Sequence, residues 1–332
     1  MKLFTPDCYS QFHCIASACP DCCCQEWEID IDPHTMETYS QLSGQLGQKI
    51  RRHIKVTPDG PVIAMENGKC AMWRKDGLCE IQVQLGHDAL CQVCREFPRI
   101  HHDYGDFMEL GLELSCPEAA RLLLTVPYEV HESQIPGGSD PEYDPVDMAV
   151  LQRTRHTALN FLRTTSLPPE QALAVLLFYG YGAQAELDGG DSAVLSPEQD
   201  LEKVQSFASA PSVPQFLEFF KALEILTPQW EERLKHPPVP SHWQPAHLAL
   251  ARYMVTRYWY QAVSDFDLVS RVKFSVIACI LVRLLGADPV ATAQLFSKEI
   301  ENDADNVDAI LDGCFTSPAL TDQHLLGLLL HL

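Results

Sequence analysis

The segment from Cys14 to Trp27, Cys-Ile-Ala-Ser-Ala-Cys-Pro-Asp-Cys-Cys-Cys-Gln-Glu-Trp, constrains the fold more than any other part of the chain. Five cysteines fall between Cys14 and Cys24, and Cys22, Cys23 and Cys24 are consecutive. Neighbouring side chains on a helix or a strand point in different directions, so three consecutive thiols cannot all face one apolar core. An irregular loop around a metal can use them. We therefore expect thiolate ligands of zinc or of an iron–sulfur cluster here, with buried free thiols or disulfides as the alternative.

The distribution of the other cysteines supports this interpretation. Of the 13 cysteines, all but Cys279 and Cys314 lie between Cys8 and Cys116. The N-terminal residues, Met1 to Asp7, lack the apolar segment of a signal peptide, so we expect a reducing, cytoplasmic location. Cysteines in that compartment are more typical of ligands than of disulfides. Cys279 and Cys314 lie in or beside apolar helical runs and are expected to be core thiols.

Charge and hydropathy exclude several classes of protein. The formal net charge of the 332-residue chain is −21, which argues against non-specific binding to nucleic acid. It is compatible with a basic substrate surface. No apolar run reaches the roughly 18 residues that a membrane-spanning helix needs. We expect neither a nucleic-acid partner nor a membrane partner.

Local sequence signals predict a mainly α protein with a small cysteine-rich α+β part at the N-terminus. We expect a metal- or cluster-binding domain over residues 1–131, a polar linker over 132–147 and an α-helical domain over 148–332, with a single surface loop in place of the linker as the alternative. In the first part the signals predict helices over Pro33–Ile54, up to Leu90 and from Pro117, a turn over 101–106 and a strand over 108–114. The helices predicted beyond the linker are Met148–Thr164, Pro169–Leu187, Pro197–Ser206, Pro214–Leu226, Pro245–Ser264, Leu268–Leu285, Pro289–Asn302 and Val307–Leu311.

Familiar nucleotide and protease motifs are missing from the sequence. It contains no G-x-x-x-x-G-K-[ST], no H-E-x-x-H and no glycine-rich turn of the dinucleotide type. Gly180-Tyr181-Gly182 lies in an apolar helical run, and we interpret it as the end of a helix rather than a ligand loop. His101 and His102 could act as ligands or bases, and a solvated surface turn is the alternative.

Eight thiols are the candidate metal ligands. Eight thiolates would saturate two four-coordinate sites, or one cluster and one zinc. Because the ligands come from dispersed segments, we expect folding of the first part to depend on the metal. The candidates are Cys14, Cys19, Cys23, Cys24, Cys70, Cys79, Cys94 and Cys116.

Four segments resemble the flagellin lysine N-methylase family in their order and approximate spacing. They are Cys19-Pro-Asp-Cys-Cys-Cys-Gln-Glu-Trp27, Asp76-Gly-Leu-Cys-Glu-Ile-Gln82, Cys94-Arg-Glu-Phe-Pro-Arg99 and Ser115-Cys-Pro-Glu-Ala119. The first and third are also similar to the smaller CxxCxxCC metal-cluster proteins. The strong part of the resemblance covers residues 8–124. Cys8, Cys22 and Cys91 have no counterpart in the family pattern, so they are not among the eight candidates.

The resemblance implies methylation of flagellin lysines, or lysines of another protein, with S-adenosylmethionine as donor and an iron–sulfur cluster in the enzyme. The cluster would be of the 4Fe–4S type, one or two per chain, with zinc as the alternative metal. The alternative function is a non-enzymatic iron–sulfur or zinc protein used for electron transfer, metal binding or recognition. The three-cysteine CxxxCxxC loop of radical enzymes is absent, since position 26 is Glu.

Direct transfer of a methyl group to an amine needs a neutral amine and an in-line approach. The catalytic residues stay unassigned in the sequence. Polar and aromatic side chains near the motif cysteines could serve the reaction, and each has a structural alternative such as helix capping or core packing. They are Asp21, Glu26, Trp27, Glu80, Arg95, Arg99, Glu118 and Arg121.

Overall fold

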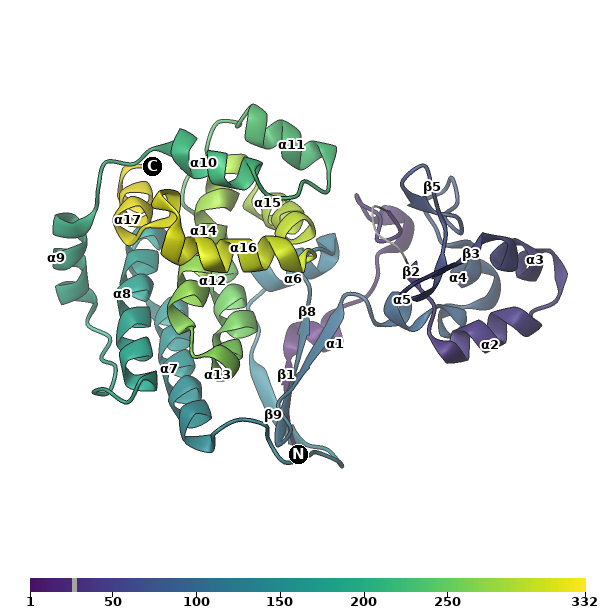
Figure 1. Cartoon of the computed structure of the whole chain (residues 1–332), viewed down its shortest axis with the longest axis horizontal. Coiled ribbons are helices and arrows are strands. Elements are labelled where there is room, and N and C mark those ends of the chain that lie inside the picture. Colours follow the sequence, from purple (N-terminus) through teal and green to yellow (C-terminus); the bar gives the residue numbers. More distant parts are fainter. Residues whose placement is uncertain (26–28) are drawn as a thin grey trace.

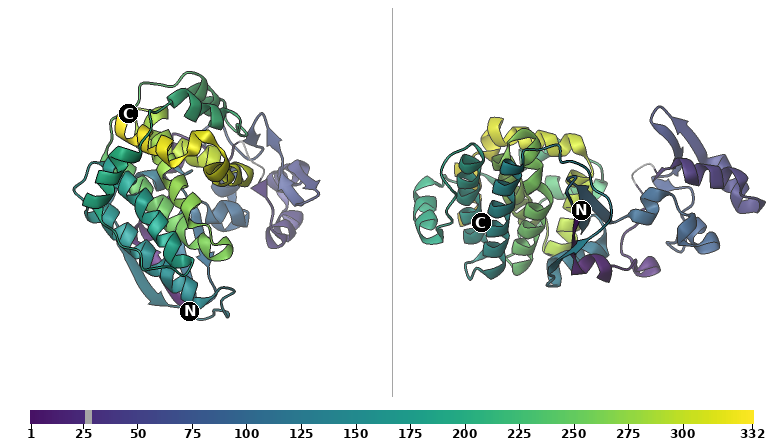
Figure 2. Two further views of the ribbon diagram at one scale, coloured as in Figure 1. Left: turned by 60° about the vertical axis from the view of Figure 1, so that its left-hand side comes forward. Right: turned by 90° about the horizontal axis from the view of Figure 1, so that it is seen from below.

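The computed structural model describes residues 1–25 and 29–332. The chain forms a large helical lobe and a small lobe, which lie at opposite ends of the long axis of the molecule (Figures 1 and 2). The structure therefore confirms a mainly α protein with a small sheet region towards the N-terminus. None of the helices in these two described ranges is both long and apolar enough to cross a membrane.

A four-stranded mixed sheet packs on the helical lobe and frames the cysteine-rich region. Strand β1 is central, parallel to β8 and antiparallel to β9, and β7 completes the order β7-β8-β1-β9. Because β1 and β7 belong to the same sheet, the chain leaves this sheet after β1 and returns to it at β7. Most of the cysteines lie on this excursion. The strands are β1 (Lys2–Pro6), β7 (Arg99–Asp103), β8 (Phe107–Leu112) and β9 (Val130–Gln134).

The small lobe has its own hydrophobic core, built around Ile29, Tyr39, Ile50 and Met72. A three-stranded antiparallel sheet in the order β2-β4-β3 and a short β5–β6 hairpin surround it, with short helices between them. The elements of this lobe are β2 (Ile29–Asp30), α2 (Pro33–Gln41), α3 (Gly44–His53), β3 (Ile54–Thr57), β4 (Gly60–Ile63), β5 (Met65–Glu66), β6 (Lys69–Cys70), α4 (Glu80–Leu85), η2 (His87–Ala89) and α5 (Gln92–Glu96).

Glycines divide two helices that the sequence predicts as continuous. The helix expected over Pro33–Ile54 is two helices, because the backbone is extended at Leu42 and Ser43 and Gly44, the first residue of α3, takes a positive φ of 82°. The helix expected to reach Leu90 ends at Leu85, because Gly86 has a φ of 88°. The predicted turn over 101–106 is also wrong in its first half. Residues 101–103 belong to strand β7, and the chain turns only after Asp103.

Helix α14 forms the centre of the large lobe and is buried along its whole length. Helices α8, α12, α15 and α16 pack around it. The core of this lobe also includes Cys8, Phe12, Phe107 and the buried face of α6, which come from before the predicted linker. The helical segments are α1 (Asp7–Gln11), η1 (Ala16–Ala18), α6 (Pro117–Thr125), α7 (Pro145–Thr164), α8 (Pro169–Leu187), α9 (Pro197–Phe207), α10 (Val213–Lys221), α11 (Pro228–Lys235), α12 (Pro245–Tyr258), η3 (Trp259–Gln261), α13 (Ala262–Asp265), α14 (Leu268–Leu285), α15 (Pro289–Phe296), η4 (Ser297–Glu301), α16 (Ala304–Thr316), η5 (Pro318–Leu320) and α17 (Asp322–His331).

The predicted bounds of α8 and α14 match the structure residue for residue. Gly180 and Gly182 do not end a helix, since α8 continues to Leu187. The helix predicted over Pro289–Asn302 leaves α-geometry after Phe296, where η4 forms a π-helical turn. Helices α11 and α17 were not expected from the sequence.

Candidate functional site

Seven cysteine sulfurs gather beside the core of the small lobe. Three come from the loop before β2, and the Cys24 carbonyl accepts a hydrogen bond of 2.7 Å from the Cys70 N–H. Cys79 lies at the start of α4, where it pairs with Trp73 in a β-bridge. Charges on neighbouring sulfurs raise the pKa values of Cys70, Cys79 and Cys94. This first thiol group consists of Cys22, Cys23, Cys24, Cys70, Cys79, Cys91 and Cys94.

Hydrogen bonds between sulfurs divide the first thiol group into donors and acceptors. The Cys24 thiol hydrogen-bonds with Cys22 and Cys23, which lowers the pKa of both and brings that of Cys22 to about 6. These two bonds raise the pKa of Cys24 itself. In the same way, the bond between Cys94 and Cys91 lowers the pKa of Cys91. Neighbouring thiols thus favour thiolates at some positions of the group, and a thiolate is the form that binds a metal.

Burial raises the pKa of the thiols that make no sulfur–sulfur hydrogen bond. It raises the pKa of Cys70 to about 11 and also raises that of Cys79. These two sulfurs are therefore neutral in the absence of a cation. A bound metal would have to displace their protons, so its affinity should increase with pH.

A second thiol group lies where the cysteine loop meets the helical lobe. It consists of Cys14, Cys19 and Cys116, where the charge of Cys14 raises the pKa of the other two thiols. Cys116 occupies the N-cap position of α6, where burial raises the pKa of its thiol to about 11. Cys19 also senses the charge of Cys23, which links the second group to the first. Cys8 is buried separately beside Tyr128.

The eight candidate ligands are distributed over both groups. The first group contains Cys23, Cys24, Cys70, Cys79 and Cys94, and the second contains the other three. Cys22 and Cys91, which the family pattern left aside, also belong to the first group. Within residues 1–25 and 29–332, no three His, Cys, Asp or Glu side chains are arranged so that they could hold a metal ion. The thiols have the chemistry of a soft-metal site, and as placed here they hydrogen-bond to one another.

Asp21 fastens the cysteine loop to the helical lobe. Its carboxylate accepts hydrogen bonds from the Cys22 N–H at 2.7 Å and from the Gln294 side-chain amide at 2.7 Å. It also pairs with Lys298 Nζ at 3.1 Å. Burial alone would raise the pKa of Asp21, but the charge of Lys298 and these hydrogen bonds outweigh it, so the pKa is lowered. The same Gln294 amide donates to the Ser115 carbonyl at 2.8 Å, next to Cys116.

A pocket of about 590 Å³ opens beside this attachment. Its walls come from the cysteine loop, the first residue of α6, helices α11 and α15 with the residues that cap them, and η4. In Figure 1 these three helices lie on the side of the helical lobe that faces the small lobe. The charged side chains that line the pocket are Asp21, Arg233, Asp288 and Lys298.

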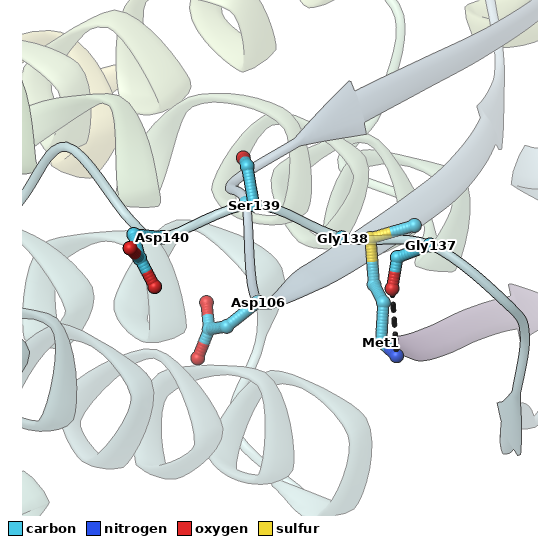
Figure 3. A pocket seen from close by; sticks show the side chains of 7 residues that line it. Met1, Asp106, Gly137, Gly138, Ser139 and Asp140 are labelled. Atoms are coloured by element: carbon cyan, nitrogen blue, oxygen red, sulfur yellow. Dashed lines mark hydrogen bonds between the residues drawn. The ribbon is translucent and has the colours of Figure 1, made fainter.

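Another pocket, of about 530 Å³, lies at the end of the mixed sheet (Figure 3). It is lined by Met1, the turn at Gly105 and Asp106, and residues 137–140. Its Met1 amino group donates to the Gly137 carbonyl at 3.3 Å. No cysteine of either thiol group lines this pocket, so we do not assign the functional site there.

The other candidate side chains take structural roles. Glu80 pairs with Lys49 at 2.5 Å and Glu118 pairs with Arg121 at 2.7 Å. Arg95 donates to the Leu90 carbonyl, and Arg99 donates to the Phe12 carbonyl. Glu26 and Trp27 lie outside the described residues. Of the candidates that the structure describes, Asp21 alone lines the pocket beside the thiols.

Sequence reasoning missed the part of the site that the helical lobe supplies. Arg233 belongs to a helix that was not predicted, and Gln294 and Lys298 lie in a segment predicted only as a helix. No cysteine or motif marks these positions. The only signal is the Asp288-Pro289 start of α15, where Asp288 caps the helix by accepting from Val290 N–H at 2.9 Å.

Fold and site together define a cysteine-rich protein with one group of thiols beside the core of a small α+β lobe and another where the cysteine loop meets a large helical lobe. A flagellar biosynthetic protein FliU from Salmonella muenchen is 31% identical over 131 residues, which cover 36% of this chain and 74% of that protein. Lysine-N-methylases from Salmonella typhimurium strain LT2 and Salmonella choleraesuis are also 31% identical over 131 residues. This chain belongs to the flagellin lysine N-methylase family.

The match has a limited extent. The chain spans 31% of the length of the two lysine-N-methylases. No family model matches the sequence, and no solved structure matches the fold. The activity, substrate and cofactors of the whole relatives are therefore treated as proposals for this chain.

Proposed function

We propose that this protein is an S-adenosylmethionine-dependent protein-lysine N-methyltransferase that acts on flagellin in the cytoplasm and carries a cysteine-ligated iron–sulfur cluster. The observation that carries the proposal is the 31% identity to proteins named lysine-N-methylase. The two thiol groups support the cluster, because they offer the soft donors that iron–sulfur clusters and zinc prefer.

The first thiol group would hold a 4Fe–4S cluster, with Cys23, Cys70, Cys79 and Cys94 as the ligands from four separate parts of the lobe. Cys14, Cys19 and Cys116 of the second group would hold a further metal or cluster, or leave one coordination position open. When bound, the cluster would supply redox-active iron and would fasten the cysteine loop. Loading would require the sulfur–sulfur hydrogen bonds to break and the buried thiols to lose their protons.

The methyl transfer itself needs little covalent chemistry from the protein. The lysine nitrogen forms a bond to the methyl carbon while the bond from that carbon to the donor sulfur breaks. S-adenosylhomocysteine leaves, and the amine gives up one proton. Because lysine has a pKa near 10.4, the protein must take its proton or desolvate it. The net charge of −21 should attract a lysine-bearing surface to the chain.

The direct test is methyl transfer in vitro. Protein purified without oxygen is incubated with isotopically methyl-labelled S-adenosylmethionine and unmodified flagellin, and flagellin peptides are analysed by mass spectrometry. We expect labelled N-methyl groups on lysine side chains. A parallel reaction with flagellin whose lysines have been acetylated should give none. A protein that binds metal but transfers no label and binds no donor would support the alternative, a non-enzymatic metal protein.

A further inference from the structure

We propose that the pocket between the cysteine loop and helices α6, α11 and α15 binds the amino-acid end of the methyl donor, with Arg233 receiving its carboxylate. This inference rests on the proposed function, because it takes S-adenosylmethionine as the occupant. The pocket has a volume of about 590 Å³, within the range of small-ligand sites. Its Pro20 and Pro117 directly follow Cys19 and Cys116, so the occupant would lie beside the second thiol group.

Arg233 has hydrogen-bonding capacity directed to an outside partner. Its Nη1 donates to the Leu285 carbonyl at 3.0 Å and to Thr292 Oγ1 at 3.2 Å, which fixes the guanidinium against the wall. Its Nη2 and Nε make no hydrogen bond to residues 1–25 or 29–332. A guanidinium held on one side with donors available on the other suits a carboxylate.

The charges around the pocket select the kind of ligand. Arg233 lies near Asp288, and Lys298 pairs with Asp21. A phosphate in the pocket would be repelled by the carboxylates of Asp21 and Asp288. A substrate lysine would be repelled by the cations of Arg233 and Lys298. A zwitterion with a carboxylate and positive groups can match both signs at once. The amino-acid end of S-adenosylmethionine carries a carboxylate, an ammonium and a sulfonium.

The walls of the pocket are fixed in place before any ligand binds. Asp288 caps α15, and Thr227 caps α11 by accepting from the Trp230 N–H at 3.2 Å. Asp21 is tied to Gln294 and Lys298 on the opposite lobe. Such preorganisation lowers the entropy that a ligand loses on binding.

The test measures binding by isothermal titration calorimetry to the full chain, purified without oxygen. The probes are S-adenosylmethionine and its decarboxylated analogue, which lacks the carboxylate. Arg233→Gln removes the guanidinium. Lys235→Gln is the matched control, because Lys235 is on the same helix, is 56% exposed and pairs only with Glu231 in the described structure. Ala291→Trp fills the pocket from an exposed position without removing a contact.

We expect Arg233→Gln to weaken S-adenosylmethionine at least tenfold and to leave the affinity for the decarboxylated analogue within about twofold. Lys235→Gln should bind both probes as the wild type does, and Ala291→Trp should weaken both. Thermal unfolding of each variant controls for misfolding. Wild-type affinity for S-adenosylmethionine in both Arg233→Gln and Ala291→Trp would overturn the assignment of the pocket and leave the proposed function standing. A wild-type protein that binds no S-adenosylmethionine would overturn both.

Discussion

Gln294 connects the two cysteine-bearing segments through a single side-chain amide. Its Nε2 donates both to Asp21 in the cysteine loop and to the Ser115 carbonyl beside Cys116. Neither acceptor belongs to its own helix, α15. A change at this residue therefore tests whether the helical lobe positions the thiols.

Replacing Gln294 with Leu should keep most of the volume and remove both hydrogen bonds. Leaving partly buried acceptors unpaired costs about 1–3 kcal/mol. We expect amide hydrogen exchange over residues 19–25 to accelerate by about tenfold or more, because each 1.4 kcal/mol is about a factor of ten. Gln45→Leu, at an exposed position of α3, should not change exchange there. Equal exchange in Gln294→Leu and wild type would show that the loop is held by other contacts.

His247 is a buried group whose titration should affect the stability of the helical lobe. It is fully buried at the start of α12, and its Nδ1 accepts from the Gln244 N–H at 3.0 Å. Burial, helped by the charge of Arg283 and opposed by a hydrogen bond to the Gln244 backbone, lowers its pKa to about 4 from the ordinary value of 6.5. The folded protein thus holds this imidazole neutral, whereas the unfolded chain protonates it below pH 6.5.

The unfolded state therefore binds the extra proton between pH 6.5 and 4, and stability should fall as the pH is lowered through this window. The full effect is about 3 kcal/mol, from roughly 2.5 pH units at 1.36 kcal/mol each. His247→Asn keeps an acceptor for the Gln244 N–H and removes the titrating group. Urea unfolding of both proteins from pH 7.5 to 4 should show a difference in stability that narrows as the pH falls. Parallel pH profiles would contradict this account of His247.

At the scale of elements, the glycines of α8 are explained by packing. A Cβ on Gly180 would lie 2.8 Å from Val272 Cγ1 on α14, whereas a Cβ on Gly182 would lie 3.6 Å from its nearest neighbour, Ala193. The first distance is too short for two carbon atoms and the second is an ordinary contact. Gly180 thus allows α8 to approach the central helix closely.

The pair Gly180→Ala and Gly182→Ala separates packing from helix propensity. Both changes add the same methyl group to the same helix, and Ala favours a helix over Gly by about 1 kcal/mol. Gly180→Ala should destabilise the lobe by about 1–3 kcal/mol, because overpacking outweighs that gain. Gly182→Ala should be neutral or stabilising. Thermal unfolding of both variants decides the point, and equal midpoints would mean that Val272 moves aside at no cost.

Elements with strong local signals could be predicted from the sequence. Helices α8 and α14 were placed correctly because prolines, glycines and aspartates bound long apolar runs. The division of residues 33–54 just before Gly44 could not be recognised, because an isolated glycine is tolerated in helices. The π-helical turn after Phe296 has no sequence signal either. This turn contains one more residue than an α-helical turn, which changes the directions of the Lys298 and Glu301 side chains. Its formation depends on tertiary contacts.

At the scale of the whole molecule, the sequence identified the thiols but not what surrounds them. Cysteines are rare and chemically distinctive, so their clustering could be recognised at once. Their grouping into seven and three depends on how residues 14–24, 70–79, 91–94 and 116 fold back on one another. Arg233 and Lys298 reach the same place from the other lobe, more than 200 residues from the cysteine loop. One sequence without a structure gives no indication of such long-range contacts.

The domain division at residues 132–147 stays a prediction. The sheet strand β1 joins the first residues of the chain to the helical lobe, and the small lobe has a separate core. Metal binding in the small lobe would therefore stabilise mainly residues 12–98. The stability of the helical lobe would depend on its own hydrophobic core and change little.

The most direct test of the account is the metal content of the protein purified without oxygen, measured as iron, acid-labile sulfide and zinc together with a visible absorption spectrum. We predict a brown protein with about four irons and four sulfides for each 4Fe–4S cluster, thus about four or about eight of each per chain. Replacing Cys79 with Ser should lower this content, whereas replacing the buried core residue Cys279 with Ser should not. Colourless protein that contains zinc alone would contradict the iron–sulfur assignment.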